Sequence, residues 1–165
     1  MTTLEGDRFS LAARCMEEEI SDFRCSLSRV MERVRMDLED IAPQMAVLVI
    51  CANKPERQRI ASRLSDDLDV PIFEAASSKQ AEMIYRRNHP MVVVADISLG
   101  SETSLVAIDS MRSPSVVVTS ASAEPMLESV ASRLNAVPVK PSDDAETHLE
   151  NISNAVLGCM RKYNA

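Results

Sequence analysis

Three segments of the chain end in side chains whose chemistry is complementary: a carboxylate, a hydroxyl and an ammonium. Asp96 ends the run MVVVAD, Thr119 ends SVVVT, and Lys140 follows VPV. Apolar, β-branched runs without polar alternation are typical of strands buried on both faces of a parallel sheet. The carboxyl ends of such strands meet at one edge, where open α/β folds place their chemistry. We therefore expect the three groups at one sheet edge, where hydroxyls and a lysine could also hold an anion.

The composition bounds the class of protein. The chain has 165 residues, of which 45% are hydrophobic and 26% charged, enough for one ordinary domain and an appendage. A net charge of −7 and an aromatic content of 3% argue against binding to nucleic acid or to an anionic membrane. The sequence has no apolar stretch of about 18 residues and no basic-then-apolar leader, which predicts a soluble, cytoplasmic protein.

The cysteines and histidines show no metal-binding pattern. Neither His89 nor His148 has a second ligand at a suitable spacing, so no metal site is predicted. The four cysteines have no CxxC or CxxH spacing and are predicted to be free thiols: Cys15, Cys25, Cys51 and Cys159.

The first part of the chain has the apolar period of a long helix. Its apolar residues alternate in steps of four and three, as in the seam of a left-handed coiled coil. They are Phe9, Ala13, Met16, Ile20, Phe23, Leu27, Val30 and Val34. No Gly or Pro interrupts the pattern before Pro43, which predicts a helix of roughly 33 residues.

We interpret residues 1–44 as a helical segment for dimerisation or docking, and residues 45–165 as a separate domain. The dimer seam is predicted to run through Met16, Ile20, Phe23, Leu27, Val30 and Val34. Glu19 and Arg24 occupy flanking positions that can pair across a parallel homodimer. The alternatives are a different partner helix, a four-helix arrangement, or packing of the helix on its own domain.

The remainder of the chain alternates short strands with helices. The strands are predicted at 46–51, 70–75, 91–96, 115–119 and 136–139, and the helices at 56–68, 78–88, 104–111, 125–134 and 143–162. This alternation predicts an α/β fold with a doubly wound, five-stranded parallel sheet, preceded by the long amphipathic helix.

Residues 46 to about 162 resemble the receiver domain of two-component response regulators, which has a flavodoxin-like fold. The resemblance depends on Asp96 after the third strand, Thr119 after the fourth, and Lys140-Pro141 after the fifth. The turn ANKPER after the first strand also resembles its receiver counterpart. The resemblance implies a phosphorelay in which a histidine kinase phosphorylates Asp96, with Thr119 as switch hydroxyl and Lys140 as phosphate-binding lysine.

The resemblance breaks at the metal site. Receivers hold Mg²⁺ with the third-strand aspartate and an acidic pair after the first strand, but here those two positions are Cys51 and Ala52, with Asn53 next. Mg²⁺ requires oxygen ligands, usually including one or two carboxylates. Because phosphoryl transfer depends on a metal to neutralise charge, the degenerate site should suppress phosphorylation severely.

A second departure lies in the fifth strand. Val137 occupies the position where receivers carry the Tyr or Phe that moves with the switch hydroxyl. We therefore interpret the chain as a pseudo-receiver: a non-enzymatic signalling protein that needs no cofactor and acts by binding protein partners. The resemblance implies a binding face made of the fourth helix, fifth strand and fifth helix of the receiver-like domain.

Several alternatives stay open at this point. The chain is a working single-domain regulator if a histidine kinase phosphorylates Asp96, which would require Mg²⁺. A small-anion or nucleotide sensor would use Lys140 with Ser98, Ser101 and Thr103, although no phosphate-binding glycine motif is present. A plainer interpretation is that Asp96 and Lys140 form a structural ion pair. Cys51 is a redox switch if a nearby Lys140 lowers the pKa of its thiol.

Overall fold

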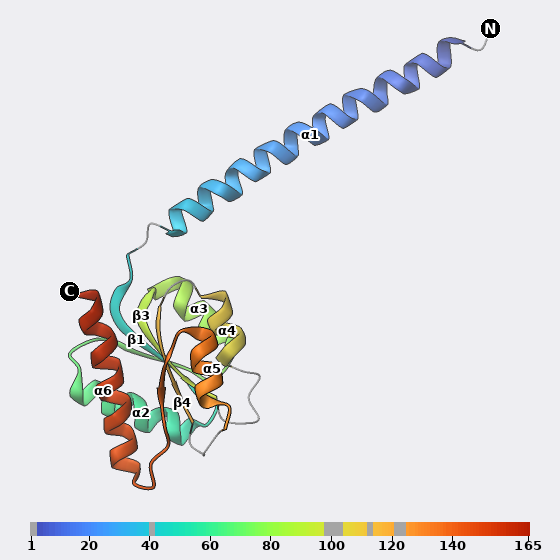
Figure 1. Cartoon of the computed structure of the whole chain (residues 1–165). Helices are drawn as coiled ribbons and strands as arrows, with labels where there is room; N and C mark the ends of the chain where they lie inside the picture. Colours follow the sequence, from blue (N-terminus) through green and yellow to red (C-terminus); the bar gives the residue numbers. More distant parts are fainter. Residues whose placement is uncertain (1–2, 40–41, 98–103, 112–113, 121–124) are drawn as a thin grey trace. The chain divides into compact units, whose positions relative to one another are not determined.

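The computed structural model of the chain divides into two compact units, residues 1–41 and 42–165 (Figure 1). It describes residues 3–39, 42–97, 104–111, 114–120 and 125–165. Within these ranges the side chains of residues 3–13, 15, 34–39 and 104–106 are not described.

The first unit is the helix α1 (Thr3–Glu39), which confirms the predicted long helix and begins earlier than its first apolar seam residue. Five of the six predicted seam residues have described side chains, and all five are exposed; Val34 lies in α1 but its side chain is outside those described. The five are Met16, Ile20, Phe23, Leu27 and Val30, at 62, 51, 68, 49 and 59% exposure. The five described seam residues therefore form an apolar stripe that α1 by itself does not bury.

The second unit alternates strands and helices, as predicted. Its strands are β1 (Gln44–Ile50), β2 (Ile72–Ala75), β3 (Pro90–Asp96), β4 (Ser115–Thr119) and β5 (Val137–Val139). Its helices are α2 (Lys54–Asp67), α3 (Ser78–Asn88), α4 (Ser104–Ser110), α5 (Leu127–Leu134) and α6 (Ala145–Tyr163). Among the helices that the structure describes, none is long and apolar enough to cross a membrane.

The strands form one parallel sheet in the order β2-β1-β3-β4-β5. This is a doubly wound order with its switch point between β1 and β3, which confirms the predicted fold class. The main difference from prediction is that β2 starts at Ile72 instead of Val70. Pro71 explains it, because proline lacks the N–H that a ladder requires, while its carbonyl still accepts a hydrogen bond from Val47 N at 3.0 Å.

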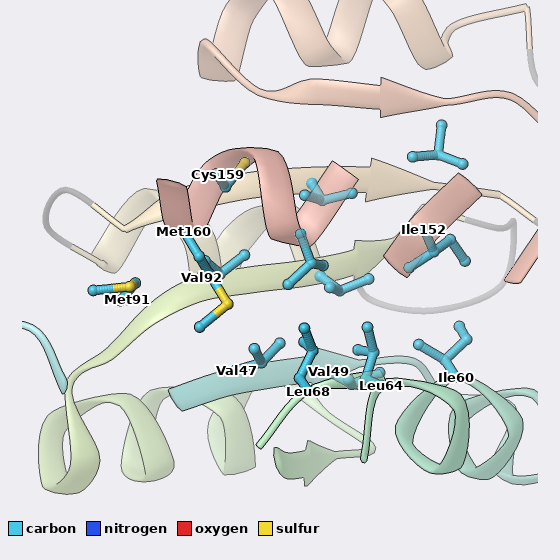
Figure 2. Close-up of a cluster of buried hydrophobic side chains, with 14 of the residues drawn as sticks. Val47, Val49, Ile60, Leu64, Leu68, Met91, Val92, Ile152, Cys159 and Met160 are labelled. Atoms are coloured by element: carbon cyan, nitrogen blue, oxygen red, sulfur yellow. The ribbon is translucent and has the colours of Figure 1, made fainter. Parts of the chain in front are cut away.

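Side chains alternate between the two faces of the sheet, and both faces are covered by helices. Val47, Val49, Val92 and Val94 pack with α2 and α6 in one apolar cluster (Figure 2). Leu48 and the other strand residues that point to the opposite face pack against α3, α4 and α5. Burial on both faces is the reason the strands need continuous apolar sequence.

Leu64 of α2 gives a test of this core, because its side chain is fully buried in the cluster under α2 and α6. We expect Leu64→Ala to lower the free energy of unfolding by about 2–5 kcal/mol, through lost burial and the cavity left behind. Urea denaturation followed by circular dichroism measures this. Met83→Ala on α3 is the matched control, since Met83 is 59% exposed and its truncation should change stability by less than about 0.5 kcal/mol. Equal effects of the two substitutions would contradict the packing described here.

Candidate functional site

The period of two along the strands places three polar side chains on the α2–α6 face at the carboxyl edge of the sheet. Cys51 follows Val47 and Val49 in the same alternation, just beyond β1, and Asp96 follows the inward valines of β3. Thr119 follows Val117 on β4 and is the direct register partner of Asp96. The structure thus brings together the predicted carboxylate and hydroxyl, with the thiol beside them.

Asp96 and Cys51 form a buried hydrogen bond across the switch point. The thiol donates to Asp96 Oδ2 at 3.1 Å, and its sulfur also lies 3.4 Å from the backbone carbonyl of Asn53. Asp96 is 8% exposed and Cys51 1%. Burial of the thiol, then its hydrogen bond to Asp96 and the negative charge there, raise the pKa of Cys51 from 9.0 to about 12. The thiol is therefore protonated near neutral pH.

This pKa shift contradicts the redox-switch alternative, which required a lowered pKa. A buried, protonated thiol is a poor nucleophile. Lys140, the predicted neighbour, pairs with Glu128 instead, so its positive charge does not stabilise a thiolate at Cys51. Cys51 acts instead as a hydrogen-bond donor.

The described residues at this edge do not fit a Mg²⁺ ion. A protonated thiol and the methyl group of Ala52 offer no oxygen ligand. The side-chain oxygen of Asn53 accepts the backbone N–H of Glu56 at 3.2 Å, which caps α2. Among the described residues no group of three His, Cys, Asp or Glu side chains is placed to hold a metal. No chemical step through a metal is derived for this site.

Arg57 fixes the position of the cysteine, a role that the sequence did not indicate. Its guanidinium donates to the backbone carbonyl of Cys51 at 2.7 Å and pairs with Glu74 of β2 at 3.3 Å. The first turn of α2 is thereby fastened to the ends of β1 and β2. The geometry of the thiol depends on this contact.

Thr119 is held by a second residue that sequence reasoning missed. Its Oγ1 lies 3.2 Å from Nε2 of His148 on α6, and both side chains are buried, at 2% and 7% exposure. A signal was available, since His148 shares helical spacing with the buried Ile152 and Cys159 on the inward face of α6. The strand-end hydroxyl is therefore directed toward α6.

Lys140 is not brought to the same group. Val137 and Val139 face the α6 cluster, so the next residue in the alternation turns to the other face, where α5 begins. Lys140 Nζ pairs with Glu128 at 2.7 Å, with both side chains well exposed, at 74% and 67%. The hydrogen bond and charge of Glu128 raise the pKa of Lys140, and those of Lys140 lower the pKa of Glu128. This ion pair replaces the predicted contact between Lys140 and Asp96.

The other predicted positions divide into described and undescribed residues. Val137 is half-buried against the α6 cluster, where it fills the place expected for a mobile aromatic ring. The loop hydroxyls considered for an anion site, Ser98, Ser101 and Thr103, lie outside the described residues.

Comparison with known proteins shows the fold. No model of a known protein family matches the chain, and no curated protein matches it. Among solved structures, the chemotaxis protein CheY4 of Vibrio cholerae is 15% identical with a TM-score of 0.55, over 68% of this chain and 98% of that one. The receiver domain of the Francisella response regulator 1452 is 14% identical with a TM-score of 0.58, over 73% and 99%.

A third similar structure is the N-terminal domain of a response regulator/sensory box/GGDEF protein from Carboxydothermus hydrogenoformans. It is 18% identical with a TM-score of 0.59, over 72% of this chain and 96% of that one. The chain therefore contains the receiver fold, preceded by the helix α1.

The raised pKa of Cys51 predicts a thiol that resists alkylation in the folded protein. At about pH 8 we expect iodoacetamide to modify the exposed Cys25 and to leave Cys51 unmodified, because the thiolate is the reactive form. Peptide mapping by mass spectrometry separates the two sites. Comparable modification of both in the native protein would contradict the hydrogen bond to Asp96.

The raised pKa of Cys51 also predicts how the free energy of unfolding changes with pH. Between pH 9.0 and about 12 the unfolded chain loses the thiol proton while the folded chain keeps it. The stability contributed by this group is therefore complete below pH 9.0 and declines as the pH rises through that window. Cys51→Ala should remove this part of the alkaline decline.

Proposed function

We propose that the protein is a pseudo-receiver: a non-enzymatic signalling protein that acts through protein–protein contacts without metal-dependent phosphorylation of Asp96. The observation that carries this proposal is that each of the three receiver-like side chains has a protein partner. Asp96 accepts from Cys51, and Thr119 contacts His148. Lys140 pairs with Glu128.

A phosphoryl group on Asp96 would have to displace the Cys51 thiol without help from a cation. Transferring a phosphoryl group to Asp96 requires charge neutralisation that Mg²⁺ supplies in phosphoryl-transfer enzymes. At the first position of the receiver acidic pair, Cys51 supplies a thiol proton to Asp96 where a receiver has a carboxylate. The side chains at the carboxyl edge of the sheet are therefore suited to stay in a single conformation.

The binding surface that we propose is formed by α5, β5 and α6. The Lys140–Glu128 ion pair links the end of β5 to the first turn of α5 on this surface, and both side chains are accessible to a partner. The chain carries a net charge of −7, which favours a partner with a basic or mixed surface. A histidine kinase is one candidate partner of this kind, and other signalling proteins are equally compatible.

Titration with Mg²⁺, followed by Mg²⁺ with beryllium fluoride as a phosphoryl mimic, tests the proposal by amide NMR. We expect no perturbation centred on Asp96, Thr119 and Lys140 at about millimolar metal, because the oxygen ligands are too few. In Cys51→Asp a second carboxylate next to Asp96 should bring metal binding into that range.

Cys51→Ser is the matched control for this experiment, since it changes the same atom without adding a carboxylate and should stay silent. A metal-dependent perturbation of the unmodified protein at these three positions would overturn the proposal. Asp96 would then be assigned as a working phosphoacceptor.

We also propose that α1 pairs with α1 of a second copy of the chain. The support is the unbroken apolar stripe of α1, since side chains such as Phe23, at 68% exposure, are costly to leave in water. Glu19 and Arg24 add opposite charges at positions that flank the stripe in a paired helix.

Substitution of the stripe in the full-length chain tests this pairing. We expect Ile20→Glu with Leu27→Glu to convert a dimer into a monomer, because two carboxylates per helix would be buried in the seam. Sedimentation equilibrium measures the mass. Ser21→Glu with Ser28→Glu adds the same charge one residue further along, on the outward side of the helix, and should leave the dimer intact. A monomeric unmodified protein, or equal effects of both pairs, would refute the proposal.

A further inference from the structure

His148 is a buried imidazole at the start of a helix, with its two nitrogens in different situations. Nε2 lies 3.2 Å from Thr119 Oγ1, whereas Nδ1 is buried and has no hydrogen-bond partner among the described residues. The ring is 7% exposed, so little of it is open to water. Neither nitrogen takes part in the contacts of Asp96 or Lys140 described above.

The unpartnered nitrogen decides which tautomer is favoured. A neutral imidazole has one N–H donor and one acceptor nitrogen, and a threonine hydroxyl can serve as either. If Nδ1 carried the proton, a buried N–H would be left without an acceptor, which proteins almost always avoid. With the proton on Nε2, the donor is satisfied by Thr119 and only a lone pair is left unpaired.

The ring is attached to a part of the helix that is itself firmly held. The backbone N–H of His148 donates to the carbonyl of Asp144 at 3.0 Å, and Asp144 caps α6 through its side chain. The next residue, Leu149, is buried in the core cluster. Glu146, in the first turn of α6, pairs with Arg63 of α2 at 3.2 Å. The backbone that carries the imidazole is therefore held by the cap and the packing of α6.

We propose that His148 is a positioning residue that locks the orientation of Thr119 by donating its Nε2–H to Oγ1, and so couples the end of β4 to the start of α6. Receivers carry a mobile aromatic residue at the position of Val137. Here the imidazole of His148, on α6, contacts the hydroxyl instead. A partner that displaces α6 would act on the Thr119 hydroxyl through this bond, a consequence that rests on the proposed signalling function.

The first test is the tautomer of His148 in the full-length, ¹⁵N-labelled protein. Long-range ¹H–¹⁵N spectra of the imidazole should show a protonated Nε2 and an unprotonated Nδ1. His89, the other histidine of the chain, is the internal reference, and His148→Gln identifies the signals. A protonated Nδ1 of His148 would overturn the lock.

The second test is the χ1 rotamer of Thr119, measured from three-bond couplings. In the unmodified protein and in His148→Gln, which keeps an N–H donor, we expect one staggered rotamer. In His148→Leu, which fills similar space without a donor, we expect averaged couplings and amide exchange in β4 faster by on the order of fivefold. An unchanged single rotamer in His148→Leu would show that the ring only fills space.

The outcomes of these two tests of His148 can be distinguished from the outcomes of the metal titration. Metal binding at Asp96 would overturn the pseudo-receiver proposal and leave the tautomer of His148 as measured. A wrong tautomer would overturn the lock while the silent titration stood.

Discussion

The carboxylate of Asp96 is buried at the end of a central strand, and a buried negative charge must be met by a cation or by hydrogen-bond donors. Cys51 supplies such a donor from the neighbouring strand. The thiol proton of Cys51 is retained because burial, then the hydrogen bond to Asp96 and the negative charge there, raise the pKa of the thiol. Other features of the edge, including the poor fit for a metal and the unreactive thiol, depend on this contact.

The geometry of the edge follows from the two-residue period of the strands. Cys51, Asp96 and Thr119 continue the valine positions that face α2 and α6, so the three side chains gather on one side. Lys140 comes one residue after Val139, which belongs to the same face, and therefore turns toward α5 and Glu128. The pleat of the short edge strand β5 is therefore enough to separate Lys140 from Asp96.

The fold could be predicted because its signals are local. Valine-rich runs, helical periods and the order in which they alternate determine a parallel sheet and its helices, and the polar residue at each strand end marks the edge. The partners of those residues could not be predicted in the same way. His148 reaches Thr119 through the packing of α6 on β4, across 29 residues of sequence, and Glu128 reaches Lys140 through the placement of α5. The direction of the Cys51 pKa shift could not be predicted for the same reason, because it depends on the burial of the thiol and on which charge lies beside it in space.

Under the proposed signalling function, the internal partners of Asp96 and Thr119 would also limit how a signal enters the protein. A ligand shifts a conformational equilibrium only by the difference between its affinities for the two states. At this edge a metal would find a carboxylate that accepts a thiol hydrogen bond and a hydroxyl held by an imidazole, so binding would first have to break contacts that already exist. A protein that covers α5, β5 and α6 meets no such cost, and its contact area can supply differential free energy directly at the helix that carries His148. This arrangement is therefore consistent with the protein contacts that we propose as its form of input.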